Sequence, residues 1–291
     1  MTTTLLITTY NWPEALEVVL MSIENLTVMP DEIVIADDGS TKETEIVVKK
    51  WQQRLKTPII HSWQEDLGFR AAASRNRAIA KATGELIIMI DGDLVLHPNF
   101  IKDHIAHSKA NQFTIGTRVL LKEEYSKKLI AEKNINFAVS NNSILANHKN
   151  RINNTILSKI ISHKTTSDKQ VRSCNMACFK SDLIKVNGFN EDFIGWGRED
   201  TELVVRLLNA KITRKNIKFN ANVLHIFHKE NSKKMLPTND LILEKVVKEK
   251  LARCVILVYF ECSIIIMPSS SNNSRSKTVF TIFSNVSWSK A

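Results

Sequence analysis

The chain has 291 residues, 43% of them hydrophobic and 24% charged, which is typical of a folded globular protein and argues against a disordered or fibrous one. Its net charge of +10 favours an anionic partner, such as a phosphate-bearing substrate, an anionic lipid or a nucleic acid. None of the four cysteines forms a CxxC pair, so the sequence predicts neither a zinc site nor a disulfide framework.

The N-terminus lacks the basic start and long apolar run of a signal peptide. The most apolar stretch, residues 255–267, is too short to span a bilayer. We therefore expect a cytoplasmic protein.

The first hundred residues alternate between apolar strand patterns and amphipathic helical patterns. Strands are predicted at residues 5–9, 32–37, 58–63 and 85–91. A first helix is predicted to start at Pro13, and a second to follow a capping box formed by Ser40 and Glu43. A third is predicted over residues 70–83, and a fourth from Pro98. This order predicts βαβ units and therefore an α/β fold with a mostly parallel twisted sheet flanked by helices.

The pattern loosens after Arg118. Residues 118–172 hold eleven Lys and Arg against four Asp and Glu, and the alternative to an anion-binding role is a solvated basic surface. We expect a nucleotide-binding half at 1–118, a basic and partly helical insertion at 119–171, an acceptor-binding half at 172–236, a C-terminal helix at 237–254, and a disordered or linker-like tail at 255–291.

Polar residues follow three of the predicted strands where each one ends. They are Thr8-Thr9-Tyr10-Asn11, Asp37-Asp38-Gly39-Ser40 and Asp91-Gly92-Asp93. Since ligands bind beyond the carboxyl ends of parallel strands, we expect all three segments to lie at one edge of the sheet.

Asp91 and Asp93 have the spacing and the chemistry of a divalent cation site. No GxGxxG or GxxxxGK[ST] loop is present to hold phosphate with backbone N–H groups. Mg²⁺ or Mn²⁺ held by these carboxylates can bridge the oxygens of a diphosphate and stabilise it as a leaving group. The alternative is a turn with two solvated carboxylates.

Asp38 and Arg70 are candidates for contacting a nucleotide. A carboxylate at Asp38 can accept an N–H from a base edge, and the Arg70 guanidinium can pair with phosphate through two hydrogen bonds. The alternatives are helix capping by Asp38 and a surface charge at Arg70.

The segment Gly195-Trp196-Gly197-Arg198-Glu199-Asp200 joins an aromatic ring to two carboxylates at the start of a helix. Trp196 can stack on a sugar face. The helix dipole favours ionised Glu199 and Asp200, as a general base for an acceptor hydroxyl requires. The alternative is helix capping with a core tryptophan.

His225 and His228 end a predicted strand, and imidazole is a suitable Mn²⁺ ligand. Side chains three apart in an extended chain point to opposite faces, so both can reach one cation only if the strand has ended. The alternative is a packed or surface histidine.

These segments resemble a known family. TTYN, DDGS, the GFR helix and DGD are similar to the family 2 glycosyltransferases of GT-A fold. GWGREDTEL with HIFH is similar to the galactosyltransferase-like segment of β-1,4-galactosyltransferases and bacterial chondroitin-polymerase-type enzymes. The resemblance covers roughly residues 3–235, and the order of DGD and GWGRED is its most specific feature.

The resemblance implies a metal-dependent inverting glycosyltransferase. It would move a hexose or N-acetylhexosamine from a UDP-linked sugar to a hydroxyl of a glycan or lipid-linked glycan, in bacterial lipopolysaccharide or capsule synthesis. The implied donor contacts are Thr8, Tyr10, Asp38, Arg70, Asp91, Asn175 and Trp196. The implied metal ligands are Asp93, His228 and His225. Asp200 would be the catalytic base, and Glu199 with Trp196 would hold the acceptor.

Three other functional readings of the sequence stay open. A sugar nucleotidyltransferase can share this sheet, and a basic nucleic-acid-binding protein can use residues 118–172, although no nucleic-acid motif supports it. We expect no nucleic-acid partner. The positive charge also suits peripheral contact with the anionic cytoplasmic face of an inner membrane, where lipid-linked acceptors lie.

Overall fold

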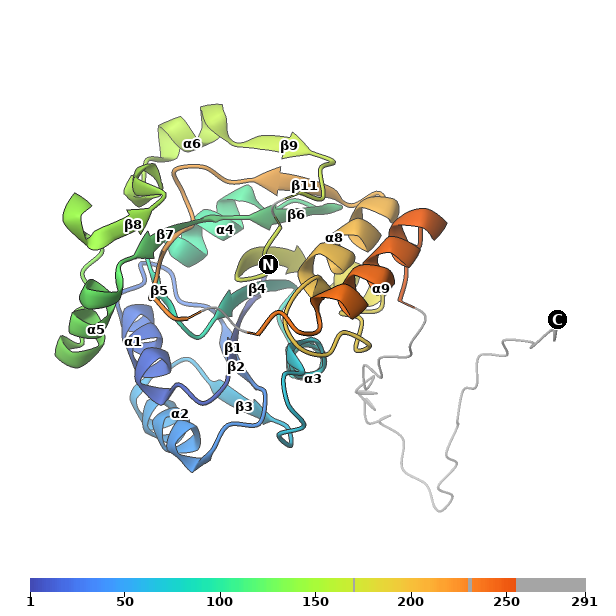
Figure 1. Ribbon diagram of the computed structural model, residues 1–291. Coiled ribbons are helices and arrows are strands. Elements are labelled where there is room, and N and C mark those ends of the chain that lie inside the picture. The colour runs from blue at the N-terminus through green and yellow to red at the C-terminus, as the bar shows by residue number, and fades with distance from the viewer. Residues whose placement is uncertain (170, 230–231, 255–291) are drawn as a thin grey trace, which may run out of the picture. The chain divides into compact units, whose positions relative to one another are not determined.

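The computed structural model describes residues 1–169, 171–229 and 232–254, so the tail expected at 255–291 lies outside the described residues. Its main feature is an eight-stranded sheet (Figure 1). In spatial order the strands are β3 (Ile59–Trp63), β2 (Glu32–Asp37), β1 (Thr3–Thr9), β4 (Leu86–Asp91), β10 (Asn175–Phe179), β6 (Gln112–Ile115), β11 (Thr213–Asn216) and β9 (His163–Thr165). Strands β3, β2, β1 and β4 are parallel, which confirms the predicted fold class.

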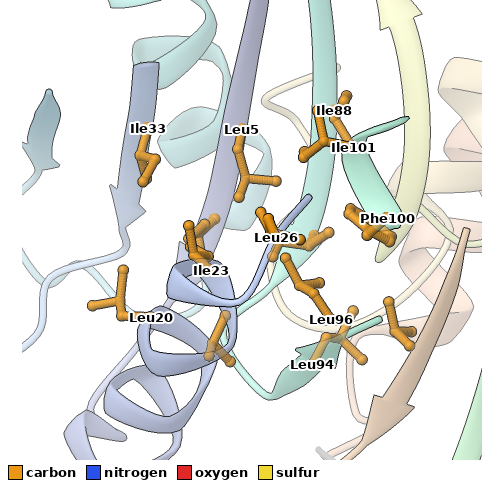
Figure 2. Packing of buried hydrophobic residues seen from close by; sticks show 14 of the residues in the cluster. Leu5, Leu20, Ile23, Leu26, Ile33, Ile88, Leu94, Leu96, Phe100 and Ile101 are labelled. Atoms are coloured by element: carbon orange, nitrogen blue, oxygen red, sulfur yellow. The ribbon is translucent and has the colours of Figure 1, made fainter. Parts of the chain in front are cut away.

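Helices cover both faces of this sheet, because neighbouring residues of a strand point to opposite sides. Leu5 packs with α1 (Pro13–Glu24), α2 (Lys42–Arg54) and α4 (Phe100–His107), in the core that Figure 2 shows. Leu6 packs on the other side with α3 (Ala71–Lys81), α7 (Lys180–Lys185) and α8 (Glu199–Asn209). The strands are therefore buried on both faces, as their continuous apolar sequences require.

A second sheet of four strands stands beside the first. Its order is β5 (Leu94–Leu96), β12 (Asn222–His225), β7 (Thr117–Leu121) and β8 (Ile144–Ala146). Its apolar side packs with α1 and with α5 (Glu123–Glu132). Strand β5 follows Asp93 directly and pairs with β12, so this sheet brings His225, the last residue of β12, close to the end of β4.

The basic segment 119–171 contributes to both sheets. It supplies β8 to the small sheet and β9 to the edge of the large one, and between them lies α6 (Thr155–Ile161). The last described helix, α9 (Leu236–Glu249), packs against α8. No helix in the described part of the chain has the length and apolar character needed to cross a membrane.

Two predicted helix starts are wrong. The Ser40 hydroxyl accepts a hydrogen bond from the Asn11 N–H at 2.9 Å, so Ser40 does not cap a helix, and α2 begins after Thr41 without a side-chain cap. Helix α4 begins at Phe100 rather than Pro98, because the Asn99 N–H donates to His97 Nδ1 and holds this stretch in a turn. In both cases a hydrogen bond with a residue outside the helix moves the start of the helix away from the position that the sequence pattern predicts.

Candidate active site

The strand register brings the three polar strand ends together. Thr8 of β1 lies opposite Asp91 of β4, and Thr9 lies opposite Asp37 of β2. The chain then turns tightly at Gly92, whose N–H donates to the Thr8 carbonyl at 2.7 Å. A Cβ at Gly92 would lie 3.0 Å from that oxygen, so glycine favours the close approach of this turn to β1.

Arg75 of α3 lies at the centre of the site, and its side chain is buried. Its Nη2 lies 3.4 Å from Asp91 Oδ1, and its Nη1 lies 3.3 Å from Glu199 Oε1 and 3.6 Å from Asp200 Oδ1. Its Nε donates to Thr8 Oγ1 at 3.2 Å. Burial disfavours the guanidinium charge, but the three carboxylates outweigh it and raise the pKa of Arg75.

Glu199 and Asp200 occupy the first turn of α8 and differ in environment. Burial, followed by the charge of Asp200, raises the pKa of Glu199 to about 7, although Arg75 opposes the shift. Asp200 Oδ2 accepts the Ser173 N–H at 2.9 Å, while Asp200 Oδ1 has no hydrogen-bond partner among the described residues. Asp200 Oδ1 therefore makes only the longer ion pair with Arg75 at 3.6 Å, whereas Glu199 Oε1 lies 3.3 Å from the same guanidinium.

Asp93, His225 and His228 form the one group of potential metal ligands found in the described part of the chain. One donor atom from each lies within 4.8 Å of the others. Asp93 Oδ2 lies 3.3 Å from His228 Nε2 and 3.7 Å from His225 Nε2. Strand β12 ends at His225, so the chain can turn and bring both rings to the same carboxylate.

The surroundings of these three side chains fit a divalent cation. Asp93 Oδ1 is buried without a partner among the described residues, and burial together with the charge of Asp91 raises the pKa of Asp93 to about 7. His228 Nδ1 lies 2.8 Å from the Lys229 carbonyl, which accepts its N–H and leaves Nε2 free to ligate. One carboxylate and two imidazoles suit Mn²⁺ and related cations.

The predicted nucleotide-contacting residues lie at the ends of β1 and β2 and at the start of α3. Asp38 accepts hydrogen bonds from Gln64 Nε2 at 2.6 Å and from the Arg70 backbone N–H at 2.8 Å. The Tyr10 hydroxyl donates to Asp66 Oδ2 at 2.9 Å, and its ring is exposed. Their contact with a nucleotide stays a prediction.

Two predicted residues lie apart from the carboxylates. Asn175 is buried: its amide donates to the carbonyls of Thr117 and Ala221, and its Oδ1 accepts His104 Nε2–H at 2.9 Å. Trp196 is 38% exposed in the turn before α8, with Lys233 Nζ 5.9 Å from its ring centre. Contact of Asn175 or Trp196 with a sugar stays a prediction.

The sequence reasoning missed Arg75. The predicted helix is alanine-rich, and Arg75 falls three residues after Ala72 and four before Ile79, both of which are buried. An arginine on the apolar stripe of a helix needs carboxylate partners, because a buried unpaired charge is costly. The position of Arg75 among the apolar residues of this helix could therefore have indicated a buried ion pair.

An α/β sheet with carboxylates at the ends of parallel strands, next to an aspartate–histidine cluster, fits the GT-A class of glycosyltransferases. The family model described as glycosyl transferase family 2 matches residues 4–186, and the chain belongs to this family. A second model, described as the N-terminal domain of galactosyltransferase, matches residues 159–229 and so includes Glu199 and Asp200.

Known relatives agree with this assignment. The chain is 29% identical to validoxylamine A glucosyltransferase of Streptomyces hygroscopicus subsp. limoneus, covering 69% of this chain and 46% of that protein. It is 27% identical to chondroitin synthase of Escherichia coli, covering 70% of this chain and 32% of that protein. The chain therefore spans less than half the length of either relative.

The fold is also similar to that of a solved structure, S. aureus TarS 1–349 in complex with UDP. The TM-score is 0.59 at 15% identity, covering 88% of this chain and 67% of that chain. At this identity the likeness concerns the fold alone.

Proposed function

We propose that this glycosyltransferase is metal-dependent and inverting, and that it moves a hexose or N-acetylhexosamine from a UDP-sugar to a hydroxyl of a glycan acceptor. The convergence of Asp91, Glu199 and Asp200 on Arg75, next to Asp93, His225 and His228, carries this proposal. UDP in the related TarS fold supports the choice of donor. The chondroitin and hyaluronan synthases among the relatives support a surface glycan, as in lipopolysaccharide or capsule synthesis, as the product.

Asp200 is the proposed catalytic base. It takes the proton of the acceptor hydroxyl as that oxygen attacks the anomeric carbon, and the bond from this carbon to the diphosphate oxygen breaks. Attack from the face opposite the leaving group inverts the configuration. Arg75 holds Asp200 and Asp91 at fixed positions, and Glu199 and Trp196 orient the acceptor.

Thr8, Tyr10, Asp38 and Arg70 are proposed to hold the nucleotide, with Asp91 near the diphosphate and Asn175 behind the donor sugar. Asp93, His225 and His228 would hold Mn²⁺ or Mg²⁺. A bound divalent cation would neutralise phosphate oxygens and stabilise the departing nucleoside diphosphate.

We also propose that α6 docks on an anionic membrane. Ile156 and Ile160 lie one helical turn apart and are 73% and 74% exposed. Leu157 and Ile161 are exposed beside them, and the exposed Lys159 lies on the same helix. Apolar side chains next to basic ones are the pattern of a helix that lies in the interface of an anionic bilayer, where a lipid-linked acceptor would be presented.

A panel of nucleotide sugars tests the proposed reaction. With Mn²⁺ present, we expect UDP release from one or a few UDP-sugars, and NMR of the product should show an inverted anomeric configuration. Release of pyrophosphate from a nucleoside triphosphate and a sugar phosphate would instead identify a nucleotidyltransferase. Retention of configuration would contradict the single displacement at Asp200.

A further inference from the structure

A cavity lies near Asp200, on the other side of β4 from the proposed nucleotide contacts. Its volume is about 370 Å³, and it is formed by the ends of β6 and β11, the start of β7 and the segment leading into β10. Four cationic side chains line it, together with several asparagines. These cations are Arg118, Arg172, Arg214 and Lys218. No carboxylate belongs to its wall as far as the chain is described.

The wall of this cavity supplies no carboxylate of its own, although Asp91 and Asp93 attract Arg118, and Asp168 attracts Arg214, from outside it. No ion pair joins Arg118, Arg172 or Lys218 to a carboxylate among residues 1–169, 171–229 and 232–254. The guanidinium of Arg118 donates from Nη1 to the neutral thiol of Cys174 at 3.7 Å, and Asp91 and Asp93 act on it without forming an ion pair. Four cationic groups on a concave wall that itself holds no carboxylate favour an anionic occupant.

Arg214 is fixed in the wall of the cavity by neutral partners. Its Nη1 donates to the carbonyls of Ser167 and Lys169 at 3.0 and 2.8 Å, and its Nε donates to Asn216 Oδ1 at 2.8 Å. The residue is 5% exposed. Its guanidinium stays charged beside the cavity, and Asp168 is the carboxylate that attracts it.

The cavity and the catalytic carboxylates share a wall. Arg172 lines the cavity, and the next residue, Ser173, donates its N–H to Asp200 Oδ2 at 2.9 Å. Cys174 also lines the cavity. In the sheet, β1 and β2 with Thr8 and Asp38 lie on one side of β4, whereas β10, β6 and β11 lie on the other.

We propose that this cavity binds an anionic substituent of the acceptor glycan, a carboxylate or a phosphate, while an acceptor hydroxyl lies at Asp200. This inference rests on the proposed function and narrows it to acidic acceptors. The cavity lies across β4 from Thr8 and Asp38, and its wall includes Asn175, the residue proposed to lie behind the donor sugar, so an acceptor bound in it would meet that sugar. Its volume lies in the range of small-molecule sites and suits one or two sugar units.

Binding of simple sugars to the full-length protein tests the proposal. The probes are D-glucuronate and glucose 6-phosphate, with D-glucose as the neutral reference, titrated by NMR in the presence of Mn²⁺ and UDP. We expect both acids to bind about tenfold or more tightly than glucose, since each charge-assisted contact adds affinity. Arg172→Gln with Lys218→Gln should reduce this preference to about threefold or less.

Arg77→Gln is the matched control, because Arg77 is exposed in the middle of α3 and away from the cavity. It should leave the preference for acidic sugars unchanged. Equal binding of charged and neutral sugars, or an equal loss in the Arg77 variant, would overturn the proposal. So would a charge preference found only between UDP-glucuronate and UDP-glucose, because the anion would then belong to the donor.

Binding of UDP, measured on the same samples, distinguishes failure of the acidic-acceptor inference from failure of the proposed function. If UDP and Mn²⁺ bind but acidic sugars show no preference, the acidic-acceptor inference fails and the proposed function stands. If UDP does not bind, the proposed function fails, and the assignment of the cavity to an acceptor fails with it.

Discussion

Arg75 Nη1 lies 3.3 Å from Glu199 Oε1, although the two residues are 124 positions apart in the chain. This ion pair joins the part of the chain that matches glycosyl transferase family 2 to the part that matches the galactosyltransferase segment. The two sequence segments therefore meet in one charged cluster.

Asp200→Asn should reduce kcat by a factor on the order of 10²–10⁴, because a neutral amide cannot take the acceptor proton. UDP binding should persist, since asparagine can still accept the Ser173 N–H. Steady-state kinetics and UDP titration check both expectations. Asp240→Asn, which removes the partner of the exposed Arg198, is the control and should leave kcat unchanged. Equal kcat in the wild type and Asp200→Asn would contradict the role of Asp200.

Arg75→Gln should lower the free energy of unfolding by about 3–5 kcal/mol, because it leaves buried carboxylates without their cation. Urea unfolding measures this loss. Arg77→Gln changes the same residue type on the exposed face of α3 and should change stability by less than about 0.5 kcal/mol. Similar losses in the two variants would mean that the buried cluster contributes little.

Asp93→Asn and His228→Ala should each weaken Mn²⁺ binding by about tenfold or more, because each removes a donor atom from a small ligand set. Electron paramagnetic resonance counts free and bound Mn²⁺ without relying on turnover. His163→Ala, which changes an exposed histidine of β9, should bind Mn²⁺ as the wild type does. Removal of the cation with a chelator should abolish transfer. Unchanged Mn²⁺ affinity in both site variants would place the metal elsewhere.

The buried His104 should make stability depend on pH. Burial lowers its pKa from 6.5 to about 4 in the folded state. Below pH 6.5 the imidazole of His104 binds a proton in the unfolded chain but not in the folded one. The contribution of His104 to the free energy of unfolding therefore falls as the pH is lowered from 6.5 to about 4, and it is constant above pH 6.5. The loss amounts to about 3 kcal/mol.

Chemical unfolding of the wild type and His104→Gln at several pH values measures this contribution. The two curves should run parallel above pH 6.5, and the wild type should lose more stability than the variant below it. Parallel curves over the whole range would show that His104 titrates normally.

Ile156→Ser with Ile160→Ser should reduce binding to anionic vesicles by tenfold or more, because each buried isoleucine contributes about 1.5–3 kcal/mol. Flotation with phosphatidylglycerol vesicles at low and high salt measures the effect. Ile46→Ser is the control, since Ile46 is 65% exposed on α2. Absence of the wild-type protein from the lipid fraction would reject membrane docking by α6.

Much of the first half of the fold can be predicted from sequence, because its strands are short apolar runs with polar ends. The strand Glu32–Asp37 agrees with its predicted bounds, and the parallel order then brings Thr8 and Asp91 together. The helix starts at Lys42 and Phe100 could not be located, because hydrogen bonds from Asn11 and His97 decide them.

The centre of the site is harder to predict, because it depends on contacts between distant segments. Whether His225 and His228 reach one cation depends on where β12 ends, which is decided by its pairing with β5 and β7. Arg75 gains its role from Glu199 and Asp200, which lie far along the chain. Sequence patterns identify the strands and helices, but they do not show which charged side chains from different elements come into contact.

The antiparallel pairing of β5 with β12 places His225 opposite Leu94, the residue after Asp93. A cation held by Asp93 and His225 would therefore act as a cross-link between residues 132 positions apart (225 − 93). Because unfolding separates these two ligands and releases the cation, a cation that binds only the folded form adds stability that grows with the logarithm of its concentration. Metal supply would then govern how long the folded enzyme persists, as well as whether it can act.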